Sequence, residues 1–441
     1  MATTPTDLQR AFDALKGKQS RYALLNDFYR GRQPLQYSTE KFRNDFSALT
    51  ARWSENWAAV VVDALLDRIS LGGFNLENEP ASKSIATLWD SLDLSLDSDD
   101  IARDTAICSE AFLMVEKTTA KEDGTGGEVR VFANPPHLCH AQYCEDNPRE
   151  MAWAAKWFDK DGGACLDIYY SDHIAHYVAS KPRNDLQVYT AFTSSTEFED
   201  GEEPNEYGRI PLFHFQRERG SRNGELTNVI PLQNALNKLF ADMMVSAEFG
   251  AAPQRYAIIA AGTDSDDLAN GPNKVWRIPF DAEAPNGKPA VGQFEATQLK
   301  NFLDAIDHIA TKIAVITRTP KHYLLQQGDV SGEALIAMEA PLSRKANKYT
   351  ERLGVTWRQA AQFILELSGH VVEVNDIEPI WEDVRTVQPL TESQIRLNNT
   401  NAGIPIEVQL EDEGQTEDEI ARIHNVEQDR AERESDIGSI A

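Results

Sequence analysis

Two helix-length apolar patterns, separated by a long insert, constrain the fold of this chain more than any other feature. They cover residues 231–249 and 297–317, and in each the apolar side chains recur at steps of three and four. This spacing places them along one face of an α-helix. Pro231 suits a first helical turn, and Gly250 and Pro253 predict the end of the first helix. The sequence therefore predicts two long amphipathic helices.

The insert between these helices has a different character. Its apolar runs are short and are broken by glycine and proline, and they read YAIIAAG, VWRIPF and AVGQF. Such runs predict strands joined by turns. We therefore expect a small region that contains β-structure to separate the two helices.

A third and much longer helical pattern ends near Leu367. Ser331 predicts its N-cap, because a serine hydroxyl accepts a hydrogen bond from the first turn, and Glu333 adds a favourable negative charge there. Pro341 lies inside the pattern. A proline removes one helical hydrogen bond and clashes with the preceding turn, so we predict a kink between Ala337 and Pro341.

The N-terminal half combines helices with short strands. Residues 6–30 and 53–69 show helical spacing, whereas residues 111–215 contain short apolar runs separated by turn residues, as in an antiparallel β-rich region. The predicted strands are AFLMVEK, VRVFANP, MAWAAKWF, CLDIYYS, HIAHYVA, LQVYTAF and IPLFHF. The acidic run 197–206 predicts a solvated loop. The predicted fold class is α+β.

The composition of the chain disfavours several classes of function. The chain has 441 residues and a formal net charge of −27, with a hydrophobic fraction of 41%. That charge disfavours sequence-specific binding to nucleic acid, although it is compatible with a passage that must not grip DNA. No apolar run is long enough for a membrane span, and residues 1–19 lack the apolar core of a signal peptide. Four cysteines indicate a reducing compartment.

The sequence offers few residues for catalysis. His137, Cys139, His140 and Cys144 lie close together and are chemically able to ligate zinc, but their spacing matches no common zinc motif and a second pair is missing. Cys139 with a distant histidine is the one candidate for a cysteine hydrolase. No serine-hydrolase, zinc-protease or Walker motif occurs. Energy for moving any substrate must then come from a partner.

The sequence leaves two interpretations for each of two groups of basic residues. The first group lies on or near the second helix and comprises Lys300, Lys312, Arg318 and Lys321. In an isolated chain these residues form a solvated face, whereas in a ring they pair with acids of a neighbouring copy or project into the lumen. Trp276 and Arg277, next to Lys274, form either a small contact patch or part of an ordinary packed β-region.

The ordered set of segments resembles a known family. The segments are YRGRQPL with KFRNDFSALTARWSENWAAVVVDALLDRISLGGF, IPLFHF with VIPLQNALNKLFADMM, TRTPKHYLLQQGDVSGEALIAMEAPL, and NAGIPIEVQLEDEG. Together they extend over most of the chain, and in this order they resemble the portal, or head–tail connector, proteins of tailed double-stranded-DNA bacteriophages. Those proteins form the ring at the capsid vertex through which DNA passes.

The resemblance implies a division of the chain into the parts of an elongated ring protomer. The implied parts are a wing of N-terminal helices and a β-rich region (1–225), stem helix one (226–250), a small α/β clip (251–296), stem helix two (297–317), a tunnel loop (318–332), a kinked wing helix and its return (333–384), and a short, acidic, crown-like C-terminal region (385–441).

The resemblance also implies sites and partners. The implied DNA-facing residues are Leu325, Gln326, Gln327, Gly328, Asp329, Val330, Ser331 and Gly332. The implied clip contacts with partner proteins are Arg255, Lys274, Trp276 and Arg277. Expected partners are about twelve copies of the chain in a ring, non-specifically bound duplex DNA, the large terminase, the major capsid protein or scaffold, and the head–tail adaptor. No catalytic residue, metal, cofactor or membrane is expected, and the protein is expected at the virion vertex after assembly in the host cytoplasm.

Two other hypotheses stay open at this point. One is a Cys/His-dependent or metal-dependent hydrolase built on the β-rich half, for which Cys139 is the test position. The other is a monomeric adaptor that binds another protein through its acidic tail. A central hole in images of the purified protein separates a ring from both.

Overall fold

The computed structural model describes most of the chain. The described residues are 6–33, 35–36, 40, 55–118, 127–251, 255–258, 290–293, 298–325 and 331–382, with 397, 399–400, 402–403, 405 and 409. Two units can be distinguished, residues 1–328 with 340–384 and residues 329–339 with 385–441. Nearly all of the described secondary structure belongs to the first unit, so most of the predicted C-terminal region lies outside the described residues.

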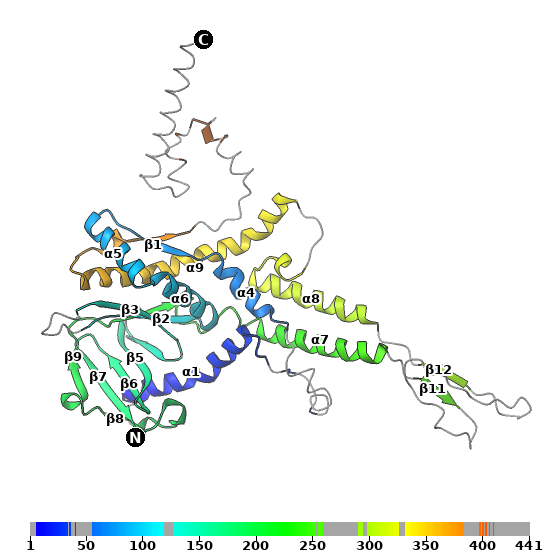
Figure 1. Cartoon of the computed structure of the whole chain (residues 1–441), viewed down its shortest axis with the longest axis horizontal. Coiled ribbons are helices and arrows are strands. Elements are labelled where there is room, and N and C mark those ends of the chain that lie inside the picture. The colour runs from blue at the N-terminus through cyan, green and yellow to red at the C-terminus, as the bar shows by residue number, and fades with distance from the viewer. Residues whose placement is uncertain are drawn as a thin grey trace, which may run out of the picture. The chain divides into compact units, whose positions relative to one another are not determined.

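The described part is a mixture of helices and antiparallel strands, which confirms the α+β prediction (Figure 1). The helices are α1 (Asp7–Tyr29), α4 (Trp57–Leu66), α5 (Glu79–Ser91), α6 (Leu94–Cys108), α7 (Ile230–Ala251), α8 (Leu299–Thr317) and α9 (Gly332–Leu367). The strands are β1 (Leu71–Asn75), β2 (Glu110–Lys117), β3 (Val129–Asn134), β4 (Cys139–Tyr143), β5 (Met151–Lys160), β6 (Gly163–Tyr169), β7 (His173–Ala179), β8 (Thr193–Ser194), β9 (Glu202–Pro204), β10 (Leu212–Gln216), β11 (Arg255–Ile258), β12 (Ala290–Gln293) and β13 (Glu378–Trp381).

The largest sheet has the order β4-β5-β6-β7-β8, and β9 also pairs with β7. Helix α1 covers one face of this sheet. Thr6 caps the helix by accepting a hydrogen bond from the backbone N–H of Gln9. Phe12 of α1 packs against Trp157 of β5, with ring centroids 5.6 Å apart. The helix is therefore fixed to the sheet by large buried side chains.

Strand β2 connects two cores. It is the central strand of the second sheet, which has the order β10-β2-β3, and five successive residues of β2 are buried. Because side chains alternate along a strand, Phe112 and Met114 face the six-stranded sheet, whereas Leu113 and Val115 join the main helical core. The sheets and helices thus pack as successive layers.

The main core forms where α9 packs with α4, α5 and α6. Trp357 of α9 is buried among the aromatic rings of Phe74, Trp89 and Phe215. The buried residues of α9 recur at steps of three and four, as its sequence predicted, and they include Leu342, Ala346, Tyr349, Leu353, Trp357, Ala360 and Ile364. Pro341 lies inside α9, and the kink at this proline stays a prediction.

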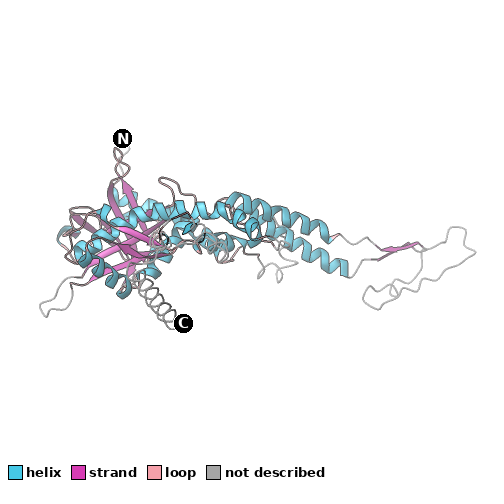
Figure 2. Cartoon of the chain, turned by 90° about the horizontal axis from the view of Figure 1, so that it is seen from above, coloured by secondary structure: helices cyan, strands magenta, loops and turns pink. Residues whose placement is uncertain are grey.

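Helices α7 and α8 run side by side (Figure 2), and both confirm the sequence prediction. The contact uses apolar residues such as Leu236 of α7 and Ile306, Ala310 and Ile313 of α8, all of which are buried. In the insert, β11 and β12 form an antiparallel pair, which confirms two of the three predicted runs. The run VWRIPF lies outside the described residues.

Two predictions for the N-terminal half need correction, and strand β4 was not predicted. LQVYTAF is not a strand: Leu186 and Phe192 fill the core under α1, and a 3-10 turn at Tyr189–Ala191 lies between them. The acidic run 197–206 is not a loop throughout, because β9 pairs with β7. Strand β4 was missed, since only Cys139 and Ala141 of its five residues are buried and the apolar signal is short.

Candidate functional site

The predicted loop is only partly described. Residues 326–330, which contain Gln326, Gln327, Gly328, Asp329 and Val330, lie outside the described residues. Leu325 is half-buried against the main core. Ser331 accepts a hydrogen bond from the backbone N–H of Ala334 at 3.3 Å, which confirms the predicted N-cap of α9. Gly332 is the first residue of that helix.

The four basic residues of the second predicted helix do not form one cluster. Lys300 lies at the start of α8 and pairs with Asp304 one turn later, with Nζ 2.9 and 3.1 Å from the two carboxylate oxygens. Lys312 is exposed in the C-terminal half of α8. Arg318 follows the helix in a left-handed conformation, and Lys321 is half-buried in a 3-10 turn. At about 1.5 Å per residue, most of α8 separates the first of these residues from the last.

The predicted partner contacts in the insert are mostly outside the described residues. Arg255 begins β11 and pairs in register with Gln293 of β12. Lys274, Trp276 and Arg277 lie outside the described residues. Their role stays a prediction.

A buried ion pair, which sequence reasoning missed, joins three helical segments. Lys345 of α9 places Nζ 2.5 Å from Glu225, which precedes α7, and also donates to the carbonyl oxygen of Thr317 at the end of α8 at 2.8 Å. Arg217 holds the other oxygen of Glu225 at 2.9 and 3.0 Å. We call Arg217, Glu225, Thr317 and Lys345 the junction. Because it contacts the segment that leads into α7 and the last residue of α8, it fixes this end of the helix pair relative to α9.

The ion pair of the junction is largely buried, and the backbone next to it is closely packed. Burial lowers the pKa of Lys345, although the carboxylate of Glu225 acts in the opposite direction. A Cβ atom on Gly224 would lie 2.0 Å from the carbonyl oxygen of Ile107, so only glycine fits beside the end of α6. The sequence signal was therefore a glycine next to a lone acid, too weak to interpret without the fold.

Buried and half-buried amides make a second connection between α7 and the N-terminal helices. Asn237 of α7 donates to Gln33 at 2.6 Å, and Gln33 donates to Asn56 at 3.1 Å. Asn56 in turn donates to the carbonyl oxygen of Tyr29, at the end of α1. Gln233 donates to Asn237 and to the carbonyl oxygen of Glu55. We call this chain of side chains the amide network, and it makes the orientation of α7 specific.

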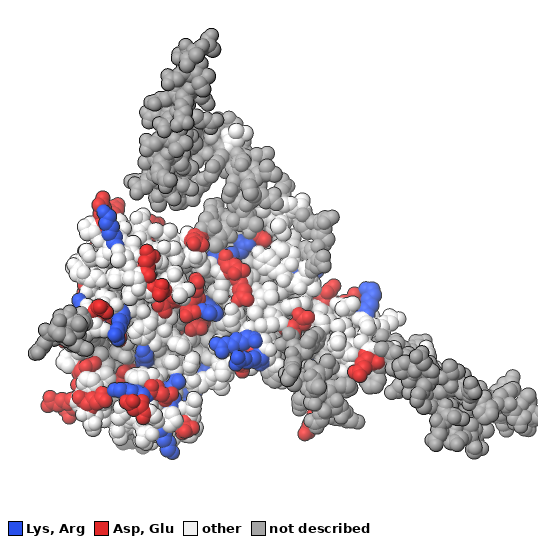
Figure 3. Space-filling view, in the orientation of Figure 1, with Lys and Arg blue, Asp and Glu red and all other residues white. Residues whose placement is uncertain are grey.

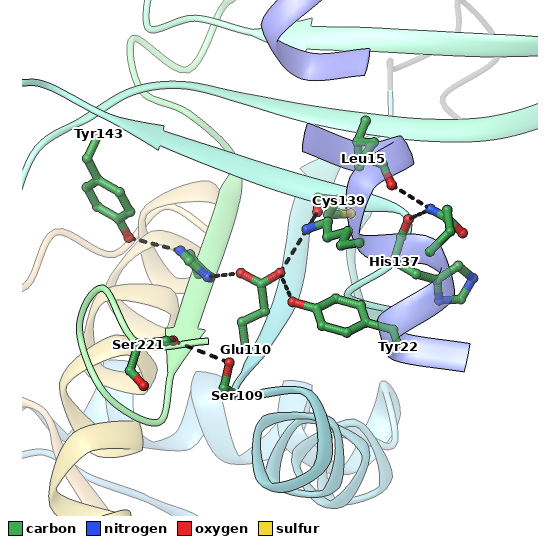
Figure 4. Close-up of polar contacts among 11 residues, drawn as sticks. Leu15, Tyr22, Ser109, Glu110, His137, Cys139, Tyr143 and Ser221 are labelled. Carbon is green, nitrogen blue, oxygen red and sulfur yellow. Dashed lines mark hydrogen bonds and ion pairs between the residues drawn. The ribbon is translucent and has the colours of Figure 1, made fainter. Parts of the chain in front are cut away.

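A third polar cluster lies between α1 and the start of β2 and resembles a catalytic site at first sight (Figure 4). Glu110 accepts hydrogen bonds from Lys18 at 2.8 Å and Tyr22 at 2.6 Å, and its second oxygen is 3.0 Å from Nε2 of His214. The other ring nitrogen of His214 contacts Tyr143. Burial opposes ionisation of Glu110, but Lys18 and His214 outweigh it and lower the pKa. Glu110 thus joins α1 to the sheets as a satisfied carboxylate.

Cys139 is not placed to act as a nucleophile. The residue is fully buried, and burial raises the pKa of its thiol to about 12, so the reactive thiolate is disfavoured. Burial also lowers the pKa of the neighbouring His140 to about 4. Within the residues that the structure describes, no group of histidine, cysteine and acidic side chains has the arrangement of a metal site.

In this fold a pair of long helices is fixed to an α+β body by a buried ion pair and an amide network. The model of the family described as "Phage portal protein, SPP1 Gp6-like" matches residues 9–432, so the chain belongs to this family of phage portal proteins. The family is a structural, non-enzymatic component of the phage capsid, with roles in genome packaging and in connecting head and tail.

Two curated relatives carry the same family name. The chain is 23% identical over 360 residues to the portal protein of Mycobacterium phage L5, which covers 74% of this chain and 68% of the relative. It is also 23% identical over 356 residues to the portal protein of Mycobacterium phage D29, with the same coverage of both chains. Within the described residues, no helix has the length and apolar character needed to span a bilayer.

Proposed function

We propose that this chain assembles into a ring of about twelve copies around a pore that passes duplex DNA during packaging and ejection. One observation carries this proposal. The helix pair exposes large apolar side chains, with Met244 43% exposed and Leu303 and Ile316 each 51% exposed. Copies packed side by side would remove these side chains from water, whereas an isolated chain leaves them solvated.

The proposal assigns the parts of the chain as follows. Helix α1, the six-stranded sheet and the sheet β10-β2-β3 form the wing. Helices α7 and α8 form the stem, and β11 with β12 belongs to the clip. Helix α9 is the kinked wing helix, residues 325–332 face the DNA, and residues 385–441 form the crown. The junction supports this assignment, because a stem under load needs a rigid attachment to the wing.

The charge of the chain fits a passage for DNA. Each copy carries a formal charge of −27, so a pore lined by many copies repels phosphate at short range. Screening over about 8–10 Å confines this effect to near contact. DNA then slides, because few of its phosphates contact lysine or arginine, and it is such contacts that release counterions and add affinity. On this account Lys300 acts mainly as the partner of Asp304, and Lys312, Arg318 and Lys321 face the lumen or a neighbouring copy.

Docking partners complete the proposal. The clip, with Arg255, Lys274, Trp276 and Arg277, would contact the large terminase during packaging and the head–tail adaptor afterwards. The wing would contact the major capsid protein or the scaffold at the capsid vertex. Assembly would take place in the host cytoplasm before the particle matures.

Electron microscopy of the purified chain tests the ring directly. We expect closed rings with a central hole when particles are viewed along their axis, and light scattering should give the mass of a multiple of the chain. A monomer at high protein concentration would contradict the proposal and favour the acidic adaptor.

A further inference from the structure

Four arginine side chains gather around the segment that leads from β10 to α7. Arg219 and Arg222 belong to this segment, residues 216–223, and both are exposed. Arg21 of α1 donates to the carbonyl oxygen of Arg222 from one side, and Arg352 of α9 donates to the carbonyl oxygen of Arg217 from the other. We call Arg21, Arg219, Arg222 and Arg352 the arginine patch. Figure 3 shows basic side chains gathered over the C-terminal half of α1.

None of these four guanidinium groups has a carboxylate partner among the described residues. The acids near the segment do not compensate them: Glu218 is exposed and forms no ion pair there, and Glu225 is already held by Arg217 and Lys345 in the junction. In a chain with 70 acidic and 43 basic residues, unpaired arginines at one place are unexpected. A partner with carboxylates or phosphates would satisfy them.

We propose that the arginine patch is a contact surface for a second copy of this chain and binds carboxylates of that copy; this inference rests on the proposed ring. The surplus of acids makes carboxylates abundant on any surface of a neighbouring copy. Arginine is enriched at protein interfaces, where its planar group binds a carboxylate through two parallel hydrogen bonds. Arg21 and Arg352 are already held by backbone carbonyls, which reduces the entropy lost on binding.

Duplex DNA is the competing partner, and the charge of the chain argues against it. Binding to duplex DNA draws its affinity from many contacts of lysine and arginine with phosphates, and the patch offers four arginines on a chain of charge −27. Long-range repulsion would slow the approach of DNA, whereas a second copy that already packs on the ring brings its carboxylates near without such a cost.

The position of the patch connects it to the stem. The segment is followed directly by Gly224, which lies against the end of α6, and by Glu225 of the junction. A subunit contact at this segment would therefore act at the attachment of α7, and it would hold the orientation of neighbouring stems as well as the spacing of the copies.

A double charge reversal tests the inference. We expect Arg219→Glu with Arg222→Glu to lower the fraction of chains in rings by about tenfold or more, because like charges across an interface repel strongly. The matched control is Arg149→Glu with Lys181→Glu, two exposed positions with the same change in net charge, and it should assemble as the original chain does. Analytical ultracentrifugation at several salt concentrations measures the fractions, and circular dichroism confirms that each variant is folded.

Hydrogen exchange gives a second measurement that needs no variant. The backbone amides of residues 216–223 should exchange more slowly in the ring than in the dissociated chain. Equal exchange in both states, normal assembly of the double variant, or equal loss in the control would each overturn the inference. If the double variant forms intact rings but no longer binds a duplex DNA probe, the inference is overturned and the patch is a surface for phosphate. An original chain that forms no ring would instead refute the proposed function.

Discussion

Lys345 and Glu225 are 120 residues apart in the chain, yet their charged groups lie 2.5 Å apart and are almost fully buried. Arg217 engages the same carboxylate, and the carbonyl oxygen of Thr317 receives a further hydrogen bond from Lys345. In this arrangement the end of α8, the approach to α7 and the middle of α9 share one ion pair. Movement of any of these segments relative to the others would break hydrogen bonds of a largely buried ion pair.

Removing the buried carboxylate should therefore be costly. For Glu225→Gln we expect the free energy of unfolding to fall by about 3–5 kcal/mol, because Lys345 keeps a buried charge without its partner. Urea denaturation measures the change. The control is Glu79→Gln, which removes an exposed partner of Lys83 and should cost less than about 0.5 kcal/mol. Equal effects of the two substitutions would show that the junction does not stabilise the chain.

The two sides of α8 should respond differently to a charge. Ile306 is buried against α7, so Ile306→Asp places an unpaired charge in the core and should lower the free energy of unfolding by several kcal/mol. Leu303, one turn earlier, is 51% exposed, so Leu303→Asp should leave unfolding nearly unchanged but reduce ring formation. Denaturation and light scattering on both variants separate the two effects. Normal ring formation by the Leu303 variant would remove the main support for the subunit contact.

A pH-dependent contact joins β7 to β9. The ring of His176 lies 2.8 Å from Asp167 and 3.2 Å from Glu203, and it stacks on Phe198. Burial lowers the pKa of His176, but the hydrogen bonds and charges of the two carboxylates outweigh it, so the net shift is upward. A histidine whose pKa is raised on folding stabilises the folded chain below its unfolded pKa of about 6.5 and loses this contribution as the pH rises through the folded value.

We therefore expect the contribution of His176 to be present at pH 5.5 and largely lost at pH 8.5. The melting temperature of His176→Gln should fall below that of the original chain at the lower pH and approach it at the higher pH. His173→Gln is the control, since that histidine is paired with an exposed aspartate and stacks on Tyr170 outside the contact. A difference that grows with pH would contradict the assignment.

Sequence reasoning succeeded where one element carries its own signal. The helical spacing of α7, α8 and α9 and the cap at Ser331 are local features, and the structure confirms each of them. It failed where a residue acts through a distant partner. The junction and the amide network join side chains that are far apart in the chain. Leu186 and Phe192 are buried in the core next to α1, and their spacing in the sequence resembles that of a strand although the segment is not one.

Substitutions test whether the predicted tunnel loop acts on DNA. Under the proposed function, in which residues 325–332 face the DNA, replacing Gly328 and Gly332 together by leucine should leave rings intact and impair DNA packaging, because both positions gain bulk and residue 328 loses the backbone freedom of glycine. Packaging is measured by complementing a phage that lacks a functional portal gene, and rings are counted by electron microscopy. Gly17→Leu is the control, since a Cβ atom at this exposed position meets no atom within 4 Å. If the double variant packages DNA at the original rate, residues 325–332 do not act on DNA, even when the ring itself is confirmed.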